Sequence, residues 1–176
     1  MSKLILKLIN KKKDKSIFIK EVQEAFQKAY VDEFGEYNKT ILPTEDIEES
    51  FNEDGSEIYF AEIEGKRVGG VVIVINKETG FNSLHLLYVN SVSQNKGIGF
   101  KIWQEIERLH PETTIWETHT PYYDKRNIHF YINRCGFKIV EFFNEKHKDP
   151  HQVGDSTGNI PMENNCFFRF EKEMKK

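Results

Sequence analysis

The segment SVSQNKGIGF, residues 91–100, separates two different apolar patterns. The run before it, LHLLYV, is short and rich in residues that favour strands. The residues after it recur at helical spacing: Ile98, Ile102, Ile106 and Leu109. Gly97 and Gly99 therefore mark a strand-to-helix turn. Backbone N–H groups at a helix N-terminus favour an anion, and glycine lets a phosphate approach, so the turn predicts a binding site for a phosphorylated ligand.

Composition limits the classes of protein that fit this chain. Its 176 residues are 38% hydrophobic and 13% aromatic, which is enough for one sizeable core, so residues 1–176 are predicted to form a single domain. A net charge of −3 and a pI near 6.1 argue against a nucleic-acid partner. No apolar run reaches membrane-spanning length. Two cysteines, Cys135 and Cys166, suit a reducing compartment, and neither has a partner at the spacing of metal ligands. We therefore expect a cytoplasmic protein without a metal site.

Apolar periodicity and turn residues predict the order of elements along the chain. Strands are expected at 3–10, 57–65, 66–76, 81–90, 113–120, 137–145 and 166–174. Helices are expected from about Phe18 to Gly35, after Pro43 with Thr44 as the cap, at 97–110 and at 126–135. The strand, helix, strand unit that ends at residue 120 implies one parallel pair of strands.

Two motifs in this order resemble the GNAT superfamily of acetyl-CoA-dependent N-acetyltransferases. LYVNSVSQNKGIG, residues 87–99, is similar to the acyl-CoA signature, in which a strand leads into Gln/Arg-x-x-Gly-x-Gly/Ala. NIHFYINRCGF, residues 127–137, is similar to a second signature, a helix that carries Phe-Tyr and ends in Gly-Phe. The resemblance implies an α/β fold with a mixed, mostly antiparallel twisted sheet of about seven strands, flanked by about four helices.

The resemblance also implies which residues bind acetyl-CoA. The turn would wrap the diphosphate, mainly with backbone N–H groups, over Gln94, Asn95, Lys96, Gly97, Ile98, Gly99 and Phe100. The fourth strand would separate from the fifth beyond Val89, so that Leu87 and Val89 pair with pantetheine amides and the Val89 N–H faces the thioester carbonyl. Asn127 would bond a CoA amide, or else cap its helix.

Acyl transfer to an amine needs a proton acceptor for the ammonium group and an acid for the departing thiolate. Tyr131 is the predicted acid, although it lies one residue further from Gly136 than in the family pattern, which fits only a bulged or overwound helix. The alternative is that Tyr131 only packs beside Phe130, in which case Tyr122 and Tyr123 are the next candidates for the acid. Glu117 is the predicted base. His119 on the same strand face, His85 and a water chain remain open.

Three functions are compatible with these residues. The first is transfer of the acetyl group to a primary amine of a small molecule or peptide, by a chain that acts alone or as a homodimer. The second is a CoA-binding module with weak turnover, and the third is a different phosphate binder. The acceptor site is expected between the first two helices and the polar loop 146–165, which we interpret as a lid.

Overall fold

The computed structural model describes residues 2–94, 96–150 and 166–175. One sheet has the strand order β1-β2-β3-β4-β5-β7-β6. Among the described strands, only β4 and β5 pair in parallel and the other neighbours are antiparallel, which confirms the predicted mixed sheet. The strands are β1 (Leu4–Leu8), β2 (Ser56–Ile63), β3 (Lys66–Val74), β4 (Phe81–Val89), β5 (Ile115–Pro121), β6 (Lys138–Phe143) and β7 (Phe167–Glu173).

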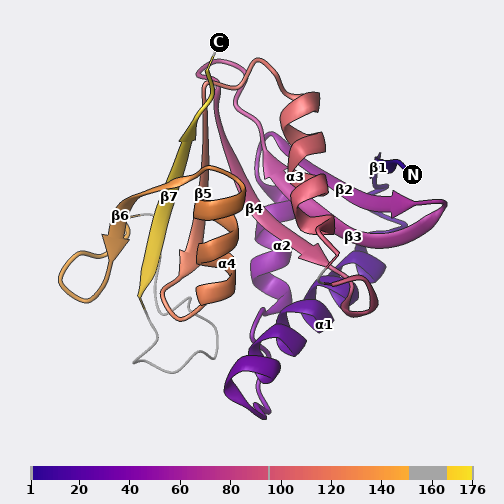
Figure 1. The fold of residues 1–176 in the computed structure, drawn as a ribbon, viewed down its shortest axis with the longest axis horizontal. Helices are drawn as coiled ribbons and strands as arrows, with labels where there is room; N and C mark the ends of the chain where they lie inside the picture. The colour runs from indigo at the N-terminus through magenta and orange to yellow at the C-terminus, as the bar shows by residue number, and fades with distance from the viewer. Residues whose placement is uncertain (1, 95, 151–165, 176) are drawn as a thin grey trace.

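Helices cover both faces of this sheet. They are α1 (Lys15–Phe34), α2 (Thr44–Asn52), α3 (Ile98–Leu109) and α4 (Lys125–His129), with a short 3-10 helix η1 (Ser91–Ser93) and a π-helical segment η2 (Phe130–Arg134) that continues α4. Figure 1 shows α3 and α4 on the near face of the sheet and α2 on the far face. Each face has its own core: Trp103 of α3 packs with Trp116 of β5 on one face, whereas Phe18 of α1 and Ile47 of α2 pack on the other.

The helical periodicity read from the sequence is largely realised in α3. Ile98, Ile102 and Ile106 are buried, but Leu109, in the last turn, is 39% exposed. The start of α2 differs from the prediction, because Pro43 is the N-cap and Thr44 is the first helical residue. Pro43 already has the extended conformation of a cap, and the Thr44 hydroxyl accepts a hydrogen bond from Gln23 Nε2 (3.1 Å) instead.

A β-bulge divides β4 into two parts. Val72 of β3 pairs with Leu86 and Ile73 pairs with Leu84, so His85 is an extra residue on β4. The extra residue reverses the alternation of side chains between the faces. Leu84 packs in the core under α3, whereas Leu86 packs in the core under α1 and α2.

The bulge also sets where β4 and β5 separate. Their parallel pairing extends over Phe81–Leu84 and Ile115–Thr118. The expectation that the strands separate beyond Val89 is therefore wrong in position, since pairing ends at Leu84. A bulge bends its strand and interrupts the ladder, which is why the separation begins beside His85. We call the V-shaped opening that follows Leu84 and Thr118 the fork.

Candidate active site

The open half of β4 presents backbone groups to the fork. The Asn90 N–H donates to Val68 O of β3 (2.8 Å). Successive residues of a strand point their backbone groups to alternate sides, so Leu87 and Val89 point theirs away from β3. Consistent with this, Gln94 Nε2 reaches the Val89 carbonyl oxygen from the other side (3.2 Å). Leu87 and Val89 therefore offer a strand edge that an extended ligand can pair with.

A cavity of about 490 Å³ extends from this edge to α1, the start of α3, and α4. It brings together most of the residues predicted from the two motifs: Leu87, Val89, Gln94, Gly97, Ile98, Gly99, Phe100, Asn127 and Tyr131. Lys96 is exposed on the turn and does not line the cavity, and Asn95 lies outside the described residues. Most of the loop interpreted as a lid, residues 151–165, also lies outside them.

The glycine turn fits a diphosphate. Gly97 is the N-cap of α3 and has φ 73°, a left-handed conformation that glycine adopts without strain. A Cβ built on Gly99 would touch the Phe130 ring at 3.4 Å and Leu87 at 3.7 Å, which is ordinary contact. Packing therefore does not require glycine at 99. Its missing side chain instead leaves the cavity open at the N-terminus of α3, where the helix dipole favours an anion.

A π-helical turn absorbs the extra residue between Tyr131 and Gly136. The Cys135 N–H donates to Phe130 O (3.0 Å), an i to i+5 bond, within the segment η2. The helix is therefore bulged. A bulge is what Tyr131 needs to offset its one-residue shift from the position of the tyrosine in the family pattern. The side chain of Tyr131 is 6% exposed, lines the cavity and packs against Phe137 and Phe170.

The hydroxyl of Tyr131 lies at the apex of the fork. It interacts with the side chain of Thr118, the last residue of β5 that pairs with β4. Thr118 Oγ1 in turn donates to Leu84 O (2.9 Å), the last paired residue of β4. Burial raises the pKa of Tyr131 above its ordinary value, with further contributions from Cys135 and Asp124, while the interaction with Thr118 acts against the shift. Tyr131 is therefore neutral at physiological pH.

Of the other predicted residues, some line the cavity and others do not. Asp124 is the N-cap of α4, since its Oδ1 accepts from the Asn127 N–H (3.0 Å), so the capping alternative for Asn127 is wrong. The Asn127 side chain lines the cavity. Glu117 does not line it, and its Oε2 lies 3.3 Å from Arg169 on β7. His85 and His119, the alternatives to Glu117, both line the cavity.

Two groups of cavity residues were missed in the sequence. Tyr30, Glu33 and Phe34 extend the cavity along α1, and continuing the helical spacing of Phe18, Val22 and Phe26 would have found that face. Arg126 and Arg134 add positive charge near the glycine turn, with the Arg134 guanidinium 5.1 Å from the Phe100 ring centroid. Arg134 lies within the second motif and Arg126 directly precedes it, so the signal was in the motif and beside it.

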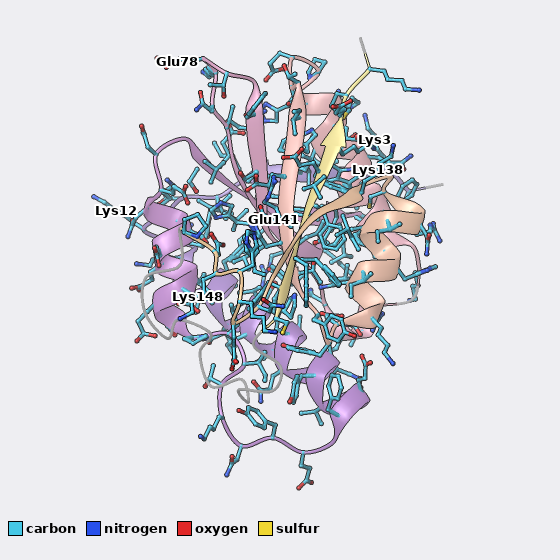
Figure 2. All side chains as sticks on the ribbon, turned by 90° about the vertical axis from the view of Figure 1, so that its left-hand side faces the viewer. Lys3, Lys12, Glu78, Lys138, Glu141 and Lys148 are labelled. Carbon is cyan, nitrogen blue, oxygen red and sulfur yellow. The ribbon has the colours of Figure 1, made fainter. Side chains whose placement is uncertain are left out.

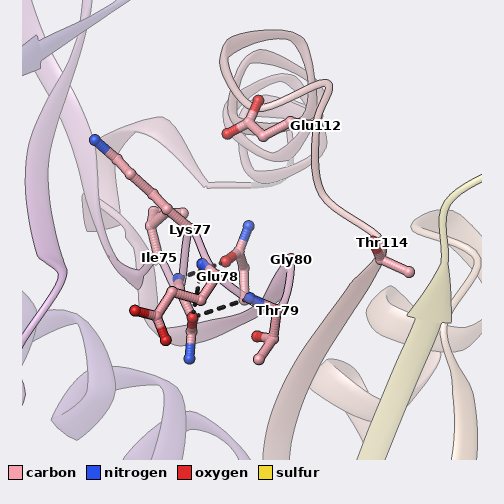
Figure 3. A pocket seen from close by; sticks show the side chains of 9 residues that line it. Ile75, Lys77, Glu78, Thr79, Gly80, Glu112 and Thr114 are labelled. Carbon is pink, nitrogen blue, oxygen red and sulfur yellow. Dashed lines mark hydrogen bonds between the residues drawn. The ribbon is translucent and has the colours of Figure 1, made fainter.

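A second, smaller pocket lies at the opposite end of β4. It has a volume of about 210 Å³ and is formed by the turn from Ile75 to Gly80 together with Glu112 and Thr114 (Figure 3). The Asn76 side chain accepts bonds from the N–H groups of Glu78 and Thr79, so the turn satisfies its own backbone groups. This pocket contains neither the fork nor the glycine turn.

The described part of the chain contains neither a metal-binding cluster nor a membrane-spanning helix. Over residues 2–94, 96–150 and 166–175, no three His, Cys, Asp or Glu side chains are grouped so that they could hold a metal ion. None of the helices in that part of the chain has the length and apolar character needed to cross a bilayer.

A forked strand edge, a glycine turn at a helix N-terminus and a buried tyrosine at the apex are what an acyl-CoA-dependent acyltransferase needs. The sequence pattern of the Acetyltransferase (GNAT) family matches residues 19–137. The chain belongs to this family and is an acetyltransferase that uses acetyl-CoA.

Individual proteins agree with this assignment. The uncharacterized protein YrkN of Bacillus subtilis (strain 168) is 45% identical over 177 residues, covering 99% of this chain and 95% of that protein. A Bacillus subtilis acetyltransferase solved in complex with CoA has a TM-score of 0.66 at 16% identity, covering 99% of this chain and 100% of that one. The spermidine N-acetyltransferase of Vibrio cholerae, solved with CoA and spermine, has a TM-score of 0.67 at 14% identity, covering 98% and 96%. At these identities the two structures show a shared fold.

Proposed function

We propose that this chain transfers the acetyl group of acetyl-CoA directly to a primary amine of a small molecule or a peptide. The observation that carries the proposal is that one cavity joins the unpaired edge of β4, the glycine turn and the side chain of Tyr131. The cavity continues to α1, where the carboxylates of Glu33 and Asp124 lie among the rings of Tyr30, Phe34 and Tyr123. Carboxylates and aromatic faces attract a cationic amine.

Acetyl-CoA is a substrate here, and the residues of this chain fix its orientation. The backbone N–H groups at the start of α3 hold the diphosphate, and the edge of β4 pairs with the pantetheine amides. We assign the thioester carbonyl to the Leu87 N–H rather than to the Val89 N–H. A strand rises about 3.3 Å per residue, so Leu87 is about 10 Å and Val89 about 17 Å from Leu84 at the apex. Leu87 is thus the outward-facing donor nearer to Tyr131.

Tyr131 protonates the thiolate that leaves when the tetrahedral intermediate collapses. An ordinary thiol is more acidic than a tyrosine whose pKa is raised by burial, and this difference opposes the transfer. The same surroundings reduce the difference, because burial raises the pKa of the adjacent Cys135 thiol to about 12. A CoA thiolate held beside Tyr131 is destabilised for the same reason, which favours its protonation.

The test is thiol release from acetyl-CoA at physiological pH with a panel of spermidine, phenethylamine and a lysine-containing peptide. We expect release that depends on at least one amine, with the acetylated amine confirmed by mass spectrometry. CoA and ATP are compared by thermal shift, and only CoA is expected to stabilise the protein. Binding of CoA without release with any amine would favour the CoA-binding module. A location in the cytoplasm is part of the proposal and is supported by the two free cysteines.

A further inference from the structure

Two histidines are the first residues of the fork on its two strands. The last pair of the β4–β5 ladder is Leu84 with Thr118. His85 follows on β4, as the bulged residue, and His119 follows on β5. Both side chains line the cavity. Each imidazole therefore lies close to the place where the proposed function puts the thioester.

The histidines lie on the opposite face of the sheet from Tyr131. His85 contacts Ser50 of α2 and Glu53, the C-cap of that helix, and α2 covers the far face in Figure 1. On β5, Trp116 packs in the core under α3, so the odd-numbered His119 points to the other face. An acceptor amine that enters from the α1 and α2 side thus meets the histidines first, with Tyr131 beyond the thioester.

The contacts of the two rings distinguish them. His85 is held at both nitrogens, with Nδ1 3.2 Å from Ser50 Oγ and Nε2 3.5 Å from Glu53 Oε2. His119 has carboxylate oxygens of Glu117 and Asp149 on its two sides, each 4.0 Å from a ring nitrogen. That distance is too long for a hydrogen bond but short enough to stabilise a positive charge. The His119 ring is also oriented by stacking on Phe143, with centroids 6.1 Å apart.

We propose that His119 accepts the proton of the acceptor ammonium group, on the face of the fork opposite Tyr131. This inference rests on the proposed function and specifies its base. Glu117, the base predicted from the sequence, becomes a positioning residue. Its Oε2 is fixed by Arg169, while its Oε1 faces His119 Nδ1. Arg169 is itself held by Glu141 (2.9 Å) and by Glu171. Figure 2 turns this side of the molecule to the viewer and labels Glu141.

The charges around His119 are compatible with this role. The His119 side chain is 39% exposed, and its partial desolvation is still the largest influence and lowers its pKa, so its imidazole is neutral and able to accept a proton at neutral pH. Glu117 and Asp149 raise the pKa, whereas Arg169 and His85 lower it. Glu53, Glu117 and Glu49 likewise raise the pKa of His85 against burial, which lowers it. His147 stacks on Phe143, and its Nε2 bonds Glu141 Oε2 (2.6 Å).

The protons balance over the reaction. The ammonium group gives one proton to His119, which later passes it to solvent. The free amine attacks the thioester carbon, and the carbon–sulfur bond breaks as the intermediate collapses. The thiolate takes the Tyr131 proton, and the second proton of the amine nitrogen restores the Tyr131 hydroxyl. The products are the amide, CoA thiol and one proton in solution.

The test compares His119→Gln with His110→Gln, a matched change at the C-cap of α3, outside the cavity. We expect His119→Gln to lower kcat/KM for the amine by about 10² or more, while the Kd for CoA stays within about threefold. His110→Gln should remain within about threefold of the native enzyme in both. In native enzyme, kcat/KM should fall at acid pH with an inflection that is the same for two amines of different pKa, and His119→Gln should lack that inflection.

Two further measurements distinguish a failure of the role of His119 from a failure of the proposed function. Imidazole added to His119→Ala should restore part of the lost activity. An NMR titration of the His119 ring in the native enzyme, assigned with His119→Gln, should give a midpoint below about 6.5, and a lower one in Glu117→Gln. Native turnover that persists in His119→Gln, or a His119 midpoint above about 7, overturns the role of His119 alone. Absence of turnover by the native enzyme with any amine instead contradicts the proposed function.

Discussion

The two halves of β4 differ in what their backbone and side chains do. In the first half, Phe81–Leu84 pair with β5, and the side chain of Asn82 is 1% exposed. That side chain donates to Thr113 Oγ1 (2.7 Å) and accepts from the Asn76 N–H (2.8 Å). In the second half, Leu87 and Val89 turn their backbone groups to the fork and line the cavity. One strand is therefore a closed part of the sheet over its first half and a binding edge over its second.

A single residue separates the two halves. His85 is the extra residue of the bulge, and the pairing with β5 ends beside it. The bulge also exchanges the two faces of the strand, so that Leu86 packs under α1 while Leu87 faces α3 and the glycine turn. The site therefore lies where β4 stops pairing with β5, and the expected effects of four changes decrease from the open half of the strand to the closed half.

The largest effect is expected at the glycine turn. Gly99→Glu puts a carboxylate beside the diphosphate, where two like charges about 4 Å apart cost about 4 kcal/mol at a protein surface. The Kd for CoA, measured by calorimetry, should rise 100-fold or more. Gly99→Ala is the control, because its Cβ makes only ordinary contact with Phe130 and alanine favours the helix. It should melt no lower than the native protein and bind CoA better than Gly99→Glu. An unchanged Kd in folded Gly99→Glu would remove the turn from the site.

How much of this site the sequence predicts depends on how local each feature is. The glycine turn and the helix after it follow from spacing within a few residues, and both were predicted. The bulge depends on how β4 pairs with Val72 and Ile73 of β3, so no pattern within β4 reveals it, and the position of the fork was predicted wrongly. The extra residue before Gly136 was visible, but only packing determines that a π-turn absorbs it.

The catalytic base shows the same limit. Strand alternation correctly places Glu117 and His119 on one face, but it does not rank them. The ranking comes from Arg169, which is far away in the sequence and reaches Glu117 across the β5–β7 pair. A residue's partners in a neighbouring strand decide whether its carboxylate is available to a substrate, and those partners follow from the sheet topology.

The second largest effect is expected at the apex, where the two halves of β4 meet. Tyr131→Phe removes the hydroxyl and keeps the ring packed against Phe137 and Phe170. We expect kcat to fall by about 10² or more with the Kd for CoA unchanged, as steady-state kinetics and calorimetry would show. Tyr122→Phe, outside the cavity, is the matched control and should be silent. Native-like turnover by Tyr131→Phe would transfer the acid role to Tyr123.

A smaller effect is expected where a side chain supports the open edge. Gln94→Leu removes the hydrogen bond to the Val89 carbonyl, and a neutral bond of this kind contributes about 0.5–1.5 kcal/mol. The KM for acetyl-CoA should rise about three- to tenfold while kcat is preserved. Gln23→Leu, whose amide bonds Leu42 O away from the fork, should leave both constants unchanged. If kcat falls instead in Gln94→Leu, this glutamine acts on the reacting groups and not on the strand edge.

The smallest effect on activity is expected in the closed half. Asn82→Ala deprives the buried Thr113 hydroxyl and the Asn76 N–H of their partner, which costs about 1–3 kcal/mol. For a chain of this size, each kcal/mol lowers Tm by about 2–4 °C, so a thermal melt should shift downward by several degrees. The KM for acetyl-CoA and kcat should stay within about threefold at a temperature where the variant is folded, because Asn82 lies on the paired side of His85. A larger loss of activity in the folded variant would mean that the paired half determines the shape of the fork, and that the bulge does not insulate one half of β4 from the other.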